Sequence, residues 1–130
     1  NNIKNIKLPV SAPFHSSLMS EATKIMSQEI EKLNFLDSSN KLISNVTAKE
    51  ILDTKELKKL LIKQIENKVR WRESVVNMID SGVDQFIEIG PGKVLSGLIK
   101  RINKDVKTSA INNESDINNI EIWLTLSKRI

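Results

Sequence analysis

His15 is the residue of this chain whose type and setting are best suited to chemistry. It is the single histidine among 130 residues, and it follows a stretch at residues 8–14 whose two prolines favour an extended backbone. Imidazole accepts and releases a proton near neutral pH, so His15 could act as a general base. A surface or capping histidine is the favoured interpretation from the residue types alone, because they reveal no partner for the ring.

Hydroxyl groups lie near His15 in the sequence, at Ser11, Ser16 and Ser17. None of these serines stands in a G-x-S-x-G elbow, the strained turn from strand to helix that exposes a nucleophilic serine. We therefore interpret them as caps or turn residues. The sequence holds no cysteine, which excludes disulfides and thiolate sites, and a single histidine offers only one imidazole ligand, so we expect no metal site.

Residues 90–93 (GPGK) form a predicted turn between a strand and a helix. Such a turn can aim backbone amides at an anion. The sequence has neither the G-x-x-x-x-G-K-[ST] nor the G-x-G-x-x-G spacing of phosphate-binding loops, so an ordinary turn is the favoured interpretation.

The composition suits one folded domain with a modest positive charge. There are 20 basic and 16 acidic side chains, for a net charge of +4, and the aromatic fraction of 4% is low, which argues against nucleic-acid binding. No apolar run reaches the roughly 18 residues of a membrane helix, and the polar start lacks the apolar core of a signal peptide. We therefore expect a cytoplasmic protein without a membrane partner.

Basic side chains surround the second predicted helix, with three glutamates among them. A solvated helix face is the favoured interpretation, and a docking patch for an acidic partner is the alternative. The basic residues are Lys55, Lys58, Lys59, Lys63, Lys68, Arg70 and Arg72, and the acidic ones are Glu56, Glu66 and Glu73.

Periodicity and capping signals predict the elements that position these residues. Asp53, followed by Glu56, predicts a capping box at a helix start, and Gly82 predicts a left-handed helix cap. Because strands alternate with helices in the second half, the sequence predicts an α/β fold with a mainly parallel sheet and crossover helices. We expect helices over residues 17–33, from 54, over 71–81, over 93–102 and over 117–126, and strands over 41–46, 84–89 and 106–111.

Four segments together resemble the malonyl-CoA:acyl carrier protein transacylase family. They are residues 8–19 (LPVSAPFHSSLM), 44–46 (SNV), 63–75 (KQIENKVRWRESV) and 82–102 (GVDQFIEIGPGKVLSGLIKRI). The resemblance runs over nearly the whole chain but covers only the carboxyl-terminal part of the family's enzymes.

The resemblance implies the carboxyl-terminal portion of an α/β-hydrolase-like large subdomain, preceded by the last strand of a ferredoxin-like small subdomain. Residues 1–11 would end the small subdomain, and residues 12–130 would form the carboxyl-terminal part of the large one. The family's G-H-S-x-G nucleophile elbow and its substrate-carboxylate arginine belong upstream, so we expect no nucleophile in this chain.

The resemblance also implies roles for three residues. His15 matches the catalytic histidine, which takes a proton from the serine and later activates the acceptor thiol. The backbone carbonyl of Gln64 matches the group that holds the other ring nitrogen in place of a carboxylate. Phe14 matches a position linked to substrate selectivity, where a bulky ring excludes methyl-branched malonyl groups; the alternative is that Phe14 simply packs.

The implied function is malonyl transfer from malonyl-CoA to the phosphopantetheine thiol of acyl carrier protein in fatty acid biosynthesis. No metal or redox cofactor is required. The expected partners are malonyl-CoA and acyl carrier protein. An upstream half, without which the chain would be inactive, is either encoded separately, lost, or outside the sequence given. The alternative is a noncatalytic remnant or a fragment that docks acyl carrier protein.

Overall fold

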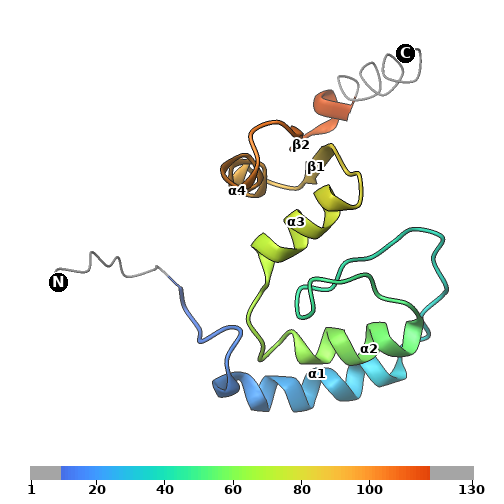
Figure 1. The fold of residues 1–130 in the computed structure, drawn as a ribbon. Coiled ribbons are helices and arrows are strands. Elements are labelled where there is room, and N and C mark those ends of the chain that lie inside the picture. Colours follow the sequence, from blue (N-terminus) through green and yellow to red (C-terminus); the bar gives the residue numbers. More distant parts are fainter. Residues whose placement is uncertain (1–9, 118–130) are drawn as a thin grey trace, which may run out of the picture. The chain divides into compact units, whose positions relative to one another are not determined.

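The computed structural model describes residues 10–117 and shows a mixed α/β structure with a small parallel sheet (Figure 1). The chain divides into two compact units, Asn1–Trp71 and Arg72–Ile130. The elements are the 3-10 helix η1 (Ser17–Met19), α1 (Ser20–Lys32), α2 (Thr54–Lys63), α3 (Trp71–Asp80), β1 (Gln85–Ile89), α4 (Val94–Ile102) and β2 (Lys107–Ile111).

Helices α1 and α2 lie side by side in the first unit (Figure 1). Ile30 of α1 and Leu60 of α2 are buried, as expected for the apolar stripes of two amphipathic helices. Lys58 on α2 donates from Nζ to the Glu31 carbonyl at 3.1 Å and lies 5.8 Å from the centre of the Phe35 ring. The aliphatic stripes and this lysine therefore fix α2 against the end of α1.

The predicted capping box at the start of α2 is confirmed. The Asp53 side chain accepts a hydrogen bond from the Glu56 N–H at 2.7 Å, and the Glu56 carboxylate accepts one from the Leu52 N–H at 2.8 Å. The side chains of the N-cap residue Asp53 and of Glu56 in the first turn thus satisfy two N–H groups at the amino end of α2.

The expected strand over residues 41–46 is wrong. Ile43 makes only an isolated antiparallel bridge, and the chain then turns. The buried Ser44 drives the turn, because its Oγ accepts from the Val46 N–H at 3.1 Å and its carbonyl accepts from the Ala48 N–H at 2.8 Å. Local side-chain bonds of this kind compete with a sheet ladder, which hydrophobic alternation alone does not reveal.

The second unit contains the parallel pair β1 and β2. Gln85 lies opposite Lys107 and Ile89 opposite Ile111, and α4, which joins the strands, packs on both of them. Parallel neighbours need such a crossover. The expected strands over residues 84–89 and 106–111 and the crossover between them are therefore confirmed in the form of a two-stranded sheet.

Apolar side chains remain exposed on and after β1. Ile89 is 80% exposed and Val94 is 70% exposed, and Ile87 and Leu95 are also exposed. Within the described residues, β1 and β2 pair only with each other. The sheet therefore has open edges as well as an uncovered apolar surface in this part of the chain.

Other expectations have mixed outcomes. The left-handed cap at Gly82 is confirmed by its φ of +95° and by the bond from the Val83 N–H to the Met78 carbonyl at 3.0 Å. The strand expected within residues 1–11 and the helix over 117–126 fall almost wholly outside the described residues. The subdomain boundary after residue 11 stays a prediction.

Glu88 of β1 caps α4 across the turn that contains Gly90 and Gly92. Its carboxylate accepts from the Ser96 N–H at 2.8 Å, the Ser96 Oγ at 2.7 Å and the Leu95 N–H at 3.1 Å. Lys93, at the N-cap position, makes no side-chain capping bond. The hydrogen bonds from Ser96, its backbone N–H first, lower the pKa of Glu88 against a smaller opposing effect of partial burial.

Glu88→Gln should lower the thermal midpoint of the chain by a few degrees at neutral pH, because a neutral amide is a weaker acceptor at a helix N-terminus. The lowered pKa means that the carboxylate stabilises the fold fully above its ordinary pKa and loses this effect as pH falls through the lowered value. Thermal melts of both proteins should therefore converge in acid. Asp105→Asn, which neutralises an exposed carboxylate of the same unit, serves as the control. A constant difference between Glu88→Gln and wild type at every pH would contradict the capping role.

Candidate active site

His15 is held in an uncommon backbone conformation just before η1. Its φ is +59°, in the left-handed region that few residues other than glycine adopt. The His15 N–H donates to the Ile65 carbonyl at 3.2 Å, and the Ser16 Oγ donates to the Pro13 carbonyl at 2.8 Å. Ser16 thus fixes the proline turn and does not cap the helix, so the backbone on both sides of His15 is restrained.

The ring of His15 has a defined partner. Its Nδ1 lies 2.8 Å from the backbone carbonyl oxygen of Gln64. A carbonyl can only accept, so Nδ1 must carry the proton in this bond. In the neutral ring the lone pair is then on Nε2, and because His15 is exposed, that nitrogen is open to accept a proton from a substrate or nucleophile.

The Gln64 carbonyl is available because of its place on α2. Gln64 is the C-cap residue, and its own N–H donates to the Leu60 carbonyl at 3.0 Å. Carbonyls in the last turn of a helix have no partner within the helix.

Asn45 holds the side chain of the same residue. Its Nδ2 donates to the Gln64 Oε1 at 3.3 Å, and its own carbonyl accepts from the Arg70 N–H at 2.8 Å. The residue types gave no reason to single out Asn45, although it stands in the SNV segment. Its contact arises because the turn that replaces the expected strand brings residues 44–48 against the end of α2.

Phe14 precedes His15 and is 58% exposed. Within the described residues Phe14 is therefore not packed into a core, and neither its selectivity role nor the packing alternative is decided by this exposure. Its selectivity role stays a prediction.

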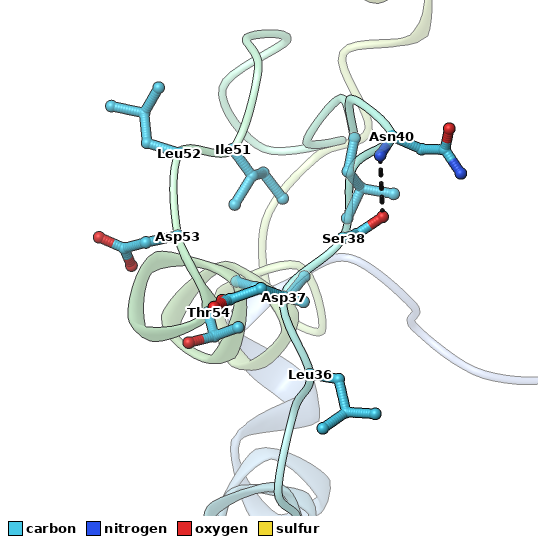
Figure 2. A pocket seen from close by; sticks show the side chains of 10 residues that line it. Leu36, Asp37, Ser38, Asn40, Ile51, Leu52, Asp53 and Thr54 are labelled. Atoms are coloured by element: carbon cyan, nitrogen blue, oxygen red, sulfur yellow. Dashed lines mark hydrogen bonds between the residues drawn. The ribbon is translucent and has the colours of Figure 1, made fainter.

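Two adjoining cavities in the first unit share Leu42, Ile51 and Leu57 in their linings. One, of about 170 Å³, is lined by Asn45 and Gln64 and by apolar residues that include Leu57 and Leu60. The other, of about 190 Å³, lies between residues 36–42 and 51–57, and Figure 2 shows the Ser38 Oγ within it bonded to the Asn40 N–H. Neither is lined by His15, so neither is a pocket around the candidate base.

Residues 10–117 contain no cluster of three or more histidine, cysteine, aspartate or glutamate side chains that could hold a metal ion. In the same range, no helix is long and apolar enough to cross a membrane.

Comparison with known sequences gives close relatives of one kind. No family model matches the chain. The chain is 42% identical over 123 residues to the malonyl CoA-acyl carrier protein transacylase of Bacillus subtilis, a match that covers 95% of this chain and 38% of that protein. It is 44% identical over 110 residues to the transacylase of Staphylococcus aureus (strain MSSA476), with 85% of this chain and 36% of that protein covered.

Solved structures give the same result for the backbone. The transacylase from Clostridium perfringens matches with a TM-score of 0.86 and 36% identity over 95% of this chain and 39% of its own. The acyl-carrier-protein-S-malonyltransferase from Bartonella henselae matches with a TM-score of 0.85 and 39% identity over 91% of this chain and 38% of its own. A malonyl-transacylase in complex with a type II PKS acyl-carrier protein matches with a TM-score of 0.78 and 35% identity, over 84% of this chain and 35% of its own.

The bond from His15 to Gln64 predicts the tautomer of the neutral ring. Free histidine prefers the proton on Nε2, and one hydrogen bond at Nδ1 should shift the ratio towards the Nδ1–H form by roughly 2- to 10-fold. Nitrogen-15 NMR of the ring at a pH where it is neutral measures this directly. Gln64→Ala should keep the tautomer, because the acceptor is the backbone carbonyl. A ring that keeps the Nε2–H preference of free histidine would contradict the arrangement.

Sequence and backbone comparisons agree on the kind of protein this chain matches. The proteins found by each comparison carry the same activity in their names, and the chain spans a little more than a third of their length. The chain belongs to the malonyl-CoA:acyl carrier protein transacylase family.

Proposed function

We propose that this chain supplies the catalytic histidine of a malonyl-CoA:acyl carrier protein transacylase acting in fatty acid biosynthesis. The observation that carries the proposal is the 2.8 Å bond from His15 Nδ1 to the Gln64 carbonyl, which leaves Nε2 as a base. Residues 12–130 would form the carboxyl-terminal part of an α/β-hydrolase-like large subdomain and residues 1–11 the end of a ferredoxin-like small one. The proposal includes the cytoplasmic location expected from the sequence.

In the first half of the reaction, a serine hydroxyl attacks the thioester carbonyl of malonyl-CoA. His15 Nε2 takes the hydroxyl proton and gives it to the departing CoA sulfur, so that a malonyl-serine ester forms and the CoA thiol leaves. The Gln64 carbonyl holds the ring throughout and stabilises the imidazolium that forms between these two transfers.

In the second half, the phosphopantetheine thiol of acyl carrier protein takes the place of CoA. His15 Nε2 removes the thiol proton, the thiolate attacks the malonyl-serine ester, and the proton returns to the serine oxygen. Each half therefore uses the same nitrogen first as base and then as acid, which a ring fixed at Nδ1 can do without turning. The 130 residues hold no G-x-S-x-G motif, so the proposal assigns the serine to a segment outside this sequence.

A second candidate is a noncatalytic remnant or a fragment that only docks acyl carrier protein. The lysine-rich α2 (Thr54–Lys63) supports it, because its basic side chains could dock an acidic partner. The two candidates differ in whether His15 takes part in transfer once the serine is supplied.

Co-expression tests the first candidate. We would combine the chain with the part of the Bacillus subtilis relative that it does not match, purify the complex and follow malonyl transfer from malonyl-CoA to acyl carrier protein. Transfer should need both parts, and His15→Ala should lower the rate by about 10²- to 10⁴-fold because the base is lost. Lys24→Ala, an exposed change on α1, is the control. A complex that copurifies but transfers no malonyl would support the remnant, and transfer by the chain alone would refute the assignment of the serine elsewhere.

Phe14→Ala tests the selectivity role in the same complex. Removing the ring should raise the rate with methylmalonyl-CoA relative to malonyl-CoA by roughly 10- to 200-fold, the discrimination that a crowded pocket achieves against one methyl group. The measurement is the ratio of kcat/KM values for the two substrates. An unchanged ratio would mean that Phe14 does not contact the acyl group.

A further inference from the structure

His15 stands at the third position of a tight turn that runs from Pro13 to Ser16. Its φ of +59° is ordinary there for glycine or asparagine, which adopt the left-handed region at little cost, but not for histidine. A strained residue of this kind persists only where surrounding contacts hold it, and such residues cluster at functional sites. The contacts that hold His15 therefore decide how its ring is presented.

The Ser16 hydroxyl closes this turn. Its Oγ donates to the Pro13 carbonyl at 2.8 Å, so a side-chain bond spans the two residues between them, Phe14 and His15. The carbonyl of the first residue is also the group at which a backbone turn is closed. We refer to the hydrogen bond from the Ser16 Oγ to the Pro13 carbonyl as the turn lock.

Ser16 stands where a serine usually has a different task. It is the N-cap residue of η1, with extended backbone angles (φ −141°, ψ 164°) that suit capping, yet its side chain makes no capping bond. The hydroxyl points back to Pro13 instead. The residue thus stabilises the turn that contains His15 and not the start of the helix that follows.

Two further bonds join the turn to the end of α2. The His15 N–H donates to the Ile65 carbonyl at 3.2 Å, and the His15 Nδ1 donates to the neighbouring Gln64 carbonyl at 2.8 Å. His15 itself makes both of these bonds, whereas a different side chain makes the turn lock. The lock can therefore be removed without changing the base or the carbonyls that the base binds.

We propose that Ser16 is a positioning residue for the proton transfers of His15. This inference rests on the proposed function, in which Nε2 accepts and returns a proton while the ring stays fixed at Nδ1. Without the turn lock, His15 would relax from its strained φ, and its ring would spend less time at the Gln64 carbonyl. Ser16 acts only through His15 and has no direct part in the proton transfers.

Nitrogen-15 NMR of the His15 ring in the 130-residue chain tests the turn lock without any catalysis. Ser16→Ala should lose most of the roughly 2- to 10-fold shift towards the Nδ1–H tautomer that the bond to Gln64 provides. Ser16→Thr retains a hydroxyl and should retain the shift. Ser17→Ala, which removes the neighbouring exposed hydroxyl, is the control and should also retain it.

Circular dichroism checks that each variant is folded. If Ser16→Ala unfolds, Ser16→Val is compared with Ser16→Thr. These two side chains are both branched at Cβ and suit the extended backbone of Ser16, so that they differ chiefly in the hydroxyl.

Rates in the co-expressed complex test the positioning role. Ser16→Ala should lower kcat for malonyl transfer by roughly 10- to 100-fold with little change in KM, because a displaced base slows the chemical step without weakening substrate binding. In a His15→Ala background the same substitution should have no further effect, because no base remains to be positioned. Ser16→Thr should restore most of the rate.

Several results would overturn the proposal. A Ser16→Ala ring with the wild-type tautomer ratio would do so, as would a loss of rate in Ser17→Ala as large as in Ser16→Ala. An equal loss with and without His15 would mean that Ser16 acts through the fold, and an unchanged kcat would remove the positioning role even if the tautomer shifts. A wild-type complex that transfers no malonyl refutes the proposed function instead, and the NMR comparison still decides whether Ser16 orients the ring.

Discussion

The hydrogen bond between the His15 ring and the Gln64 carbonyl joins two segments that are 49 positions apart in the sequence. It needs a backbone at His15 that turns back on itself and a helix that ends at the right residue. A second hydrogen bond, from the His15 N–H to the Ile65 carbonyl, holds the backbone turn at His15 in place. The helix ends at the right residue because Gln64 is its C-cap. The arrangement of the first unit around His15 depends on both.

Helix α2 connects this site to the rest of the unit. The capping box of Asp53 and Glu56 caps its amino end, and Leu60 in its middle is buried. Its carboxyl end supplies the Gln64 carbonyl that binds the His15 ring. A ten-residue helix is too short to be stable alone in water, so these tertiary and capping contacts decide whether its last carbonyl stays in place. The geometry of the base is thus a property of the whole helix.

The sequence predicted the elements that follow local rules and missed those set by longer-range contacts. The capping box, the Gly82 cap and the two strands of the second unit were predictable because capping residues and alternation act within a few positions. Residues 41–46 were wrongly predicted to form a strand, since the Ser44 side chain diverts the backbone into a turn. Asn45 and Glu88 were missed for a related reason: each acts on a residue of another element, and no spacing rule encodes that contact.

The open edges of the β1 and β2 pair have a consequence for the behaviour of the chain in solution. In the described part, N–H and C=O groups on the outer sides of both strands have no ladder partner, and Ile89 beside them is 80% exposed. Such an edge can accept a strand from another molecule. Association between copies through this edge would therefore increase with protein concentration, and a segment that covers the sheet would suppress it.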